Sequence, residues 1–263
     1  MPATSTRAAE TQETRKNGIR ALLKGLETGD PASVDVIHPD HYTQHNPQTQ
    51  TGRAGLAALF AKLSKTAPRV NLVRVFSDGD YVFAHTEYDF STRRIGFEVF
   101  RFEGAHTVEH WDNIQPRQGP NASGHSMVDG PTEATDLADT ERNRDRVRTY
   151  LREVVVNRRH DRLAEYLDPG YTQHNAELVD GIEAVRGKLE RSFEGGPAVV
   201  YTHVHRVLAE GNFVLAVSEG QLRGVHSAFY DLFRVADVRL VEHWDTIEAV
   251  APKSEWQHDN GKF

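Results

Sequence analysis

The sequence predicts an α+β protein built from two tandem copies of one small domain, each with its helices first and an antiparallel sheet after them. Two pentapeptides indicate the duplication: YTQHN occupies residues 42–46 and 171–175, and VEHWD occupies 108–112 and 241–245. The offset is 129 residues for the first (171 − 42) and 133 for the second (241 − 108). A period near 130 indicates domain duplication, because solenoid repeats have periods of about 20–50 residues.

Each copy opens with an amphipathic helix. Apolar residues follow the i, i+3, i+4, i+7 spacing of one helix face at Ile19, Leu22, Leu23 and Leu26, and again at Val147, Tyr150, Leu151 and Val154. A second short helical stretch is predicted at 34–37 and 163–167. A third helix, at 56–65 and 182–193, follows the YTQHN segment and is preceded by Gly52 and Gly181.

The rest of each copy alternates as strands do. The predicted strands are 70–77, 81–90, 95–103 and 107–114 in the first copy, and 198–208, 213–222, 227–235 and 239–247 in the second. Helices followed by a run of antiparallel strands predict helices packed on one face of a curved sheet. We place the domains at 10–118 and 140–263. The intervening 119–139 is predicted as a linker, because it is rich in Gly, Pro, Ser, Asn and Thr.

Composition excludes several classes of protein. The formal charge of −7 argues against nucleic-acid binding, which needs basic patches to replace counterions. No apolar run approaches the roughly 20 residues that cross a bilayer, so no membrane partner is expected. The first residues lack the apolar stretch of a secretory signal, which predicts a cytoplasmic protein. The sequence has no cysteine, which excludes disulfides and thiolate chemistry.

The VEHWD strand holds the first candidate site residues. Side chains of a strand alternate between faces, so His110 and Asp112 share one face while Glu109 and Trp111 share the other. If the first pair faces inward, a titratable dyad points into a pocket; if the second does, the dyad lies on the surface. The recurrence as His243 and Asp245 favours the pocket.

Further polar positions recur between the copies. Glu98 and Asp231 interrupt aromatic strands, and Glu87 and Glu219 do likewise in the preceding strand. Each carboxylate lies either on a solvated face or in a cavity, where burial would raise its pKa. His45 and His174 lie in a polar, turn-like segment, and their recurrence favours a role in lining the cavity.

These features together resemble the SnoaL-like branch of the NTF2-like superfamily, which includes polyketide cyclases. The resemblance covers about 12–118 and 140–250 and rests on the YTQHN and VEHWD segments and the glycine-led helix between them. It implies two tandem NTF2-like cones, each a curved antiparallel sheet wrapped by N-terminal helices around a cavity. His110 and Asp112 would line that cavity, with His45 reaching in from the helical side.

The same resemblance implies an aldol-type cyclase, lyase or isomerase without a cofactor. Asp112 and Asp245 would be general bases that remove a proton next to a carbonyl group. His110, His243, His45 and His174 would orient the base or stabilise the enolate. Substrate-contacting residues would be Tyr42, Tyr171, Glu87, Glu219, Glu98 and Asp231. The ligand would be a small hydrophobic or carbonyl-containing molecule.

Two alternatives stay open at the level of the sequence. One is a metal-dependent enzyme, because two histidines and one carboxylate form a known type of divalent-metal site; its ligands would be His45, Glu98 and His110, and His174, Asp231 and His243. The other is a non-enzymatic module that binds small molecules. Related cones commonly dimerise, so the resemblance also implies an intramolecular pseudo-dimer. The copies differ at two equivalent positions: His85 of the first corresponds to Val217 of the second, and Tyr88 corresponds to Gly220. The two sites therefore need not be equally active.

Overall fold

The computed structural model describes residues 3–263 and groups them into two compact units. Unit 1 contains the chain up to Asp112 together with Ala251–Phe263, and unit 2 is Asn113–Val250. Unit 1 therefore includes the residues that follow the last strand of the second repeat, and unit 2 includes those that follow the last strand of the first repeat. The boundaries predicted at 118/119 and 139/140 stay predictions.

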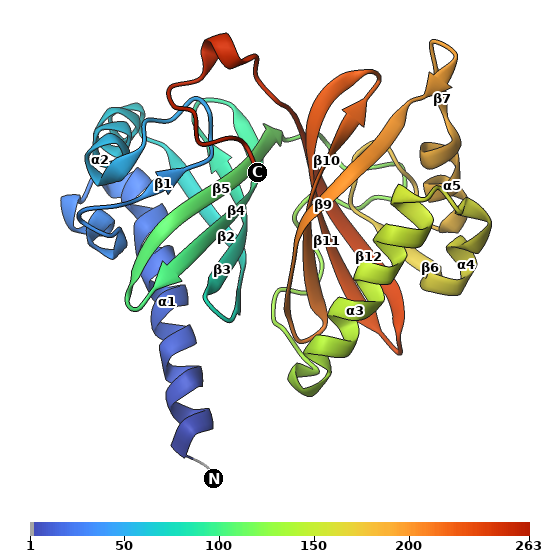
Figure 1. The fold of residues 1–263 in the computed structure, drawn as a ribbon, viewed down its shortest axis with the longest axis horizontal. Coiled ribbons are helices and arrows are strands. Elements are labelled where there is room, and N and C mark those ends of the chain that lie inside the picture. The colour runs from blue at the N-terminus through green and yellow to red at the C-terminus, as the bar shows by residue number, and fades with distance from the viewer. Residues whose placement is uncertain (1–2) are drawn as a thin grey trace. The chain divides into compact units, whose positions relative to one another are not determined.

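Unit 1 has a helical layer and a five-stranded sheet (Figure 1). Its elements in chain order are α1 (Ala3–Thr28), a 3₁₀ helix (Pro31–Val36), β1 (Thr43–Gln44), α2 (Gly52–Leu63), a 3₁₀ turn (Ser64–Thr66), β2 (Arg69–Asp78), β3 (Tyr81–Asp89), β4 (Arg93–Glu103) and β5 (His106–Pro116). The strands lie in the order β1-β5-β4-β3-β2. The 251–263 segment of this unit contains a 3₁₀ turn at Lys253–Glu255.

Unit 2 repeats this arrangement with small additions. Its elements are a 3₁₀ turn (Leu137–Asp139), α3 (Thr140–Tyr150) continued by a π-helical stretch (Leu151–Val156), a 3₁₀ turn (His160–Arg162), α4 (Leu163–Tyr166), β6 (Leu167–Gln173), α5 (Ile182–Glu190), the short pair β7 (Ser192–Phe193) and β8 (Gly196–Pro197), β9 (Val199–Glu210), β10 (Phe213–Leu222), β11 (Val225–Ala236) and β12 (Arg239–Ala249). The main sheet has the order β6-β12-β11-β10-β9. The α+β class and the two tandem domains predicted from the sequence are confirmed.

The YTQHN segments form strands that sequence periodicity did not predict. Residues 43–44 pair in parallel with β5, with Thr43 opposite Glu109 and Gln44 opposite His110. In unit 2, β6 pairs in parallel with β12 and sets Gln173 opposite His243. Each sheet is therefore mixed rather than wholly antiparallel. Two residues of strand carry no alternation signal, and the pairing depends on a partner more than 60 residues away in the sequence.

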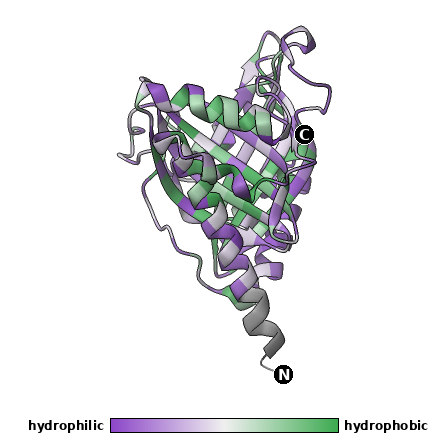
Figure 2. Ribbon diagram, turned by 90° about the vertical axis from the view of Figure 1, so that its left-hand side faces the viewer, coloured by the Kyte–Doolittle hydropathy of each residue, from purple (hydrophilic) through white to green (hydrophobic). Residues whose placement is uncertain are grey.

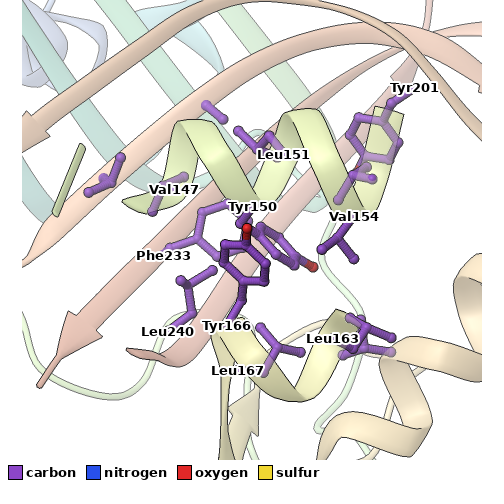
Figure 3. Packing of buried hydrophobic residues seen from close by; sticks show 14 of the residues in the cluster. Val147, Tyr150, Leu151, Val154, Leu163, Tyr166, Leu167, Tyr201, Phe233 and Leu240 are labelled. Carbon is purple, nitrogen blue, oxygen red and sulfur yellow. The ribbon is translucent and has the colours of Figure 1, made fainter. Parts of the chain in front are cut away.

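The predicted helical stripes supply the cores. All four residues of the stripe in α1 are at most 6% exposed. In unit 2, the stripe Val147, Tyr150, Leu151 and Val154 packs with Tyr166, Leu167, Phe233 and Leu240 against the sheet (Figure 3). Full burial of such a side chain contributes roughly 1.5–3 kcal/mol, so these contacts fix each helix on its sheet.

The helices carry both hydrophilic and hydrophobic residues along their length (Figure 2). Within the part of the chain that the structure describes, no helix combines the length and apolar character needed to cross a membrane.

Candidate functional site

Both faces of the VEHWD strand are buried. His110 and Asp112 therefore do not lie on the surface, although Trp111 on the opposite face is buried as well. His110 and Asp112 are 6% and 5% exposed, and Trp111 between them is 1% exposed. The two faces define two groups in each unit. We call the group around His110 or His243 the inner group, and the group around His45 or His174 the outer group.

The inner group of unit 1 is a chain of hydrogen bonds with a determined direction. Oε1 of Gln44 accepts the backbone N–H of Asn46 at 2.8 Å, which fixes this atom as an oxygen. Nδ1 of His110 lies 2.9 Å from the same oxygen, so it carries a proton and donates it. Nε2 of His110 lies 2.7 Å from Oε2 of Glu98. Because neutral imidazole has one N–H, that short contact requires a second proton, held by either His110 or Glu98.

Unit 2 has an equivalent chain, with an aspartate in place of the glutamate. Nδ1 of His243 lies 2.8 Å from Oε1 of Gln173, which also accepts the N–H of Asn175. Nε2 of His243 lies 3.0 Å from Oδ1 of Asp231. A histidine–carboxylate pair that shares one extra proton is therefore present in both units.

The tyrosine on the carboxylate comes from a different strand in each unit. Tyr88 of β3 donates its hydroxyl to Glu98 at 2.6 Å, and Val70 of β2 is its cross-strand neighbour. In unit 2 the tyrosine lies on the other strand of the equivalent pair. Tyr201 of β9 donates to Asp231 at 3.1 Å, and its cross-strand neighbour on β10 is the small residue Gly220. A Cβ at Gly220 would lie 1.9 Å from the carbonyl oxygen of Val200, so the glycine is required for this approach. The difference at Tyr88 and Gly220 thus preserves the contact.

Each inner group also contains an aspartate paired with an asparagine and a lysine. Asp112 accepts from Nδ2 of Asn46 at 2.7 Å, and Nζ of Lys262 lies 3.4 Å from its Oδ1. In unit 2 these partners of Asp245 are Asn175, at 2.8 and 2.9 Å, and Lys188, at 3.1 Å.

Burial alone would raise the pKa of the Asp245 carboxyl, yet Lys188, His243 and Asn175 together hold that pKa below its ordinary value. Asp245 is therefore a carboxylate at neutral pH. Burial therefore does not increase the basicity of this aspartate, because Lys188, His243 and Asn175 together outweigh desolvation.

A tyrosine hydroxyl completes the inner group. Tyr42 is 4% exposed, and its hydroxyl has no hydrogen-bond partner among residues 3–263. Burial, together with the charges of Glu98 and Asp112, raises its pKa well above the ordinary value, so it is a neutral donor beside two carboxylates. Tyr171 holds the same position in the second repeat, lines the cavity of unit 2, and has its pKa raised for the same first reason, burial.

The cavity of unit 2 is small. It measures about 40 Å³ and is bounded by Tyr171, Lys188, Asp231 and His243 on its polar side. Leu178, Val185 and Leu189 form part of its apolar side. A single water needs at least roughly 10–15 Å³, so this space holds a few waters at most. A larger ligand requires movement of the apolar wall.

The inner groups have the donor set of a cation site. Ligand atoms of Glu98, His110 and Asp112 lie within 4.8 Å of one another, as do those of Asp231, His243 and Asp245. Oxygen and imidazole donors suit a divalent ion. The lysine on each aspartate opposes it, because that ammonium already balances the carboxylate.

His45 and His174 belong to the outer groups and not to the inner groups, contrary to the sequence prediction of one shared cavity and of a metal site containing them. Gln44 points toward His110, so the next residue along the strand points to the opposite face. There His45 stacks on Trp111, with ring centroids 4.7 Å apart and planes at 11°. Its Nε2 lies 2.9 Å from Glu109.

Both ring nitrogens of each outer histidine face oxygen atoms. Nδ1 of His45 faces the carbonyl oxygen of Gly261 at 3.0 Å, so this nitrogen donates, and Nε2 must donate to the Glu109 carboxylate. Arg101 also binds Glu109, at 2.7 Å. Burial would raise the pKa of Glu109, but Arg101 and His45 lower it overall.

Unit 2 has the same outer group. Its members are His174, Glu242 at 2.8 Å, Arg234 at 2.6 Å from that glutamate, Trp244 stacked at 4.5 Å, and the Ser126 carbonyl at 2.7 Å from Nδ1. The glutamates were missed as partners of these histidines. Alternation along YTQHN would have separated His45 from Gln44 and pointed to them.

Glu87 and Glu219, predicted to contact substrate, lie outside both groups. Glu219 binds His205 at 3.0 Å and His226 at 2.7 Å. Asn71 donates to Glu87 at 3.4 Å. Alternation explains this placement too, because the neighbouring Tyr88 points to the inner group and Glu87 therefore points away.

Several solved structures are similar to part of this chain. Among solved structures, TsrD from Streptomyces laurentii is 20% identical, with a TM-score of 0.35, covering 39% of this chain and 89% of its own. An LEH-like epoxide hydrolase from M. tuberculosis is 17% identical, with a TM-score of 0.35, covering 40% of this chain and 84% of its own. An NTF2-like protein of unknown function from Mesorhizobium loti is 18% identical, with a TM-score of 0.35, covering 40% of this chain and 93% of its own. None of the curated proteins matches the chain.

The fold and the duplicated inner group define a tandem α+β protein made of two similar domains. The model of the SnoaL-like domain matches residues 19–113 and again residues 147–243. The chain belongs to the SnoaL-like domain family and contains two copies of that domain, which confirms the resemblance seen in the sequence.

Proposed function

We propose that each inner group catalyses proton transfer at a carbon next to a carbonyl group, as an isomerase, cyclase or lyase does. The observation that carries this proposal is the presence in each unit of two buried carboxylates with different partners. One carboxylate shares a proton with His110 or His243, and the other, Asp112 or Asp245, is balanced by a lysine. Neighbouring carboxylates that differ in protonation supply an acid and a base.

The aspartate is the base in this scheme. Asp112 or Asp245 takes a proton from the carbon, and the electron pair moves onto the carbonyl oxygen. Tyr42 or Tyr171 donates its neutral hydroxyl to that oxygen. The low pKa of Asp245 makes it a weak base, so stabilisation of the enolate has to supply much of the rate enhancement. Removal of one such oxyanion donor costs about 10²–10³ in rate in other enzymes.

The histidine–carboxylate pair is the acid. In unit 1 both nitrogens of His110 are already hydrogen-bonded, to Gln44 and Glu98. The transferable proton therefore reaches substrate through Glu98, while His110 stores it and Gln44 fixes the ring. We assign Glu98 and Asp231 this role in place of simple substrate contact. The outer histidines, His45 and His174, have no part in the reaction.

The proposal is tested by deuterium exchange, which needs no knowledge of the natural substrate. Acetylacetone, cyclohexane-1,3-dione and 2-tetralone are incubated with the chain in D₂O, and loss of the α-proton signals is followed by NMR. We expect acceleration on at least one probe. Asp112→Asn combined with Asp245→Asn is expected to reduce it by about 10²–10⁴, the usual contribution of a general base.

The matched control combines Asp40→Asn with Glu177→Gln. Both side chains are exposed and lie near the YTQHN segments in the sequence, so this variant is expected to retain full exchange. Equal loss in both variants, or no loss on changing the aspartates, contradicts the proposal. Binding of a probe without any exchange would instead favour a ligand-binding module.

A metal-dependent reaction is the second candidate, supported by the clustering of three ligand atoms in each unit. Titration of Zn²⁺ and Mn²⁺ into the chain, followed by calorimetry, tests it. Two sites per chain that are lost in the Asp112→Asn and Asp245→Asn variant, together with activity that requires the ion, would favour this candidate.

A further inference from the structure

The 251–263 segment lies along the YTQHN residues of unit 1. The N–H of Gln257 donates to the carbonyl of Pro47 at 2.8 Å. Nε2 of His258 lies 2.9 Å from the carbonyl oxygen of Asn46, and Nδ2 of Asn260 donates to the carbonyl of Gln44 at 3.0 Å. These contacts hold the segment beside the inner group.

The segment places one charged side chain inside that group. Lys262 is 4% exposed, and its Nζ donates to the backbone carbonyl of Asp112 at 2.9 Å while lying 3.4 Å from Oδ1. Burial of an ammonium group is strongly unfavourable unless it is paired. The aspartate is therefore what makes burial of this lysine tolerable, and the lysine in turn neutralises the aspartate.

Unit 2 obtains the same pair from another part of its fold. Lys188 lies on α5, and when Gly181 is aligned with Gly52 the corresponding residue of α2 is Leu59. The first repeat therefore has no lysine at that helical position. Residues 121–126 make equivalent contacts in unit 2: Asn121 donates to the carbonyl of Gln173 at 2.5 Å, and the carbonyl oxygen of Ser126 contacts His174. The lysine of that unit, however, comes from α5.

We propose that Lys262 is a positioning residue of the unit 1 site, equivalent to Lys188, and that this site is complete only when the 251–263 segment is docked. This rests on the proposed function of the inner groups. The same ammonium–carboxylate pair is built from two unrelated places in one chain, which indicates a requirement of the site rather than of the helix or segment that supplies it. Lys262 holds Asp112 in place from the side of Oδ1, while Asn46 holds Oδ2, so that the carboxylate is oriented toward substrate.

The test separates the two sites with the aspartate variants. In the Asp245→Asn chain only unit 1 is active, and we expect Lys262→Met to reduce deuterium exchange about 10- to 100-fold, the size of loss that follows misplacement of a reacting group. Lys262→Arg is expected to restore part of that rate, because it returns the charge. In the Asp112→Asn chain, Lys188→Met should produce a similar loss in unit 2. Lys253→Met, an exposed change on the same segment, is the matched control and should leave the rate unchanged.

A urea-unfolding cycle distinguishes function from packing. If the pair forms, Lys262→Met and Asp112→Asn together lower the urea midpoint by less than the sum of the two separate shifts. Non-additive midpoints together with an unchanged exchange rate in Lys262→Met would overturn the proposal, since the lysine would then be structural only. Additive midpoints would overturn it as well. A wild-type chain without exchange on any probe refutes the proposed function and, with it, this role, and that result is distinct from the other two.

Discussion

The outer groups allow a quantitative test of how burial affects an ion pair, because two equivalent glutamates are buried to different extents in the two units. The side chain of Glu242 is 6% exposed, whereas that of Glu109 is 20% exposed. Each accepts one hydrogen bond from a histidine and one from an arginine. Replacement by glutamine keeps the shape and removes the charge.

We expect Glu242→Gln to destabilise unit 2 more than Glu109→Gln destabilises unit 1. A hydrogen bond to a charged group contributes roughly 1.5–3 kcal/mol net. The amide retains part of each of the two bonds, so the expected loss at Glu242 is about 3 kcal/mol. Solvent screens the more exposed Glu109, and partly exposed ion pairs contribute about 1 kcal/mol or less, so the loss there is expected to be near that value.

The assay is urea unfolding followed by tryptophan fluorescence. Trp244 stacks on His174 in unit 2, and Trp111 stacks on His45 in unit 1, so each unit contains its own reporter beside the mutated group. Conservative Trp→Phe variants assign the signals. Equal midpoint shifts for the two glutamines, or a larger shift for Glu109→Gln, would refute the reasoning that burial sets the strength of these pairs.

Four other predictions follow from particular contacts. Gly220→Ala is expected to cost about 1–3 kcal/mol through overpacking against Val200, whereas Gly187→Ala, whose new Cβ meets no atom within 4 Å, should stabilise α5 by up to about 1 kcal/mol; urea midpoints compare them. Tyr88→Phe loses a buried hydrogen bond to Glu98 and should destabilise unit 1 by roughly 1.5–3 kcal/mol, but Tyr42→Phe loses no hydrogen bond and should leave stability unchanged while reducing deuterium exchange. Because the pKa of Glu242 is lowered in the folded chain, despite burial, by His174 and Arg234, its stabilisation is complete above the unfolded-state pKa of about 4.3 and is lost as pH falls through the folded value; the acid limb of a stability–pH curve should be shallower in Glu242→Gln. Residues 113–250 expressed alone should unfold cooperatively in urea, whereas 1–112 should do so only when 251–263 is joined to it, since those ranges are the compact units.

Much of the fold could be predicted from the sequence, because the apolar stripes of the first helices and the alternation of the eight long strands are local patterns. Residues 43–44 could not be assigned to a strand, since a two-residue strand has no period of its own and depends on β5 for its hydrogen bonds. The inner pair of His110 and Asp112 was predicted, as was Glu98. The prediction that His45 shares a cavity with His110 is wrong because His45 and Gln44, as neighbours along the chain, point to opposite faces.

Lys262 and Lys188 show the limit of comparing the two repeats position by position. Such a comparison finds identical residues such as His110 and His243, but it discards a contact whose two partners come from different places. The tyrosine on the inner carboxylate is a second such case: Tyr88 and Tyr201 lie on different strands, and Gly220 makes room for the latter.

For both the lysine and the tyrosine, the contact is the same in the two units although the residue that makes it lies at a different position. Both contacts are made to a carboxylate of the inner group. A residue serving only the core could be replaced by any side chain of similar volume, with little need to restore a hydroxyl on Glu98 or an ammonium on Asp112. The recovery of the same chemical group from a new position therefore argues that the inner groups of both units perform the same task. Deuterium exchange that falls by about half in each single aspartate variant, and is lost in the double variant, would establish that both sites work.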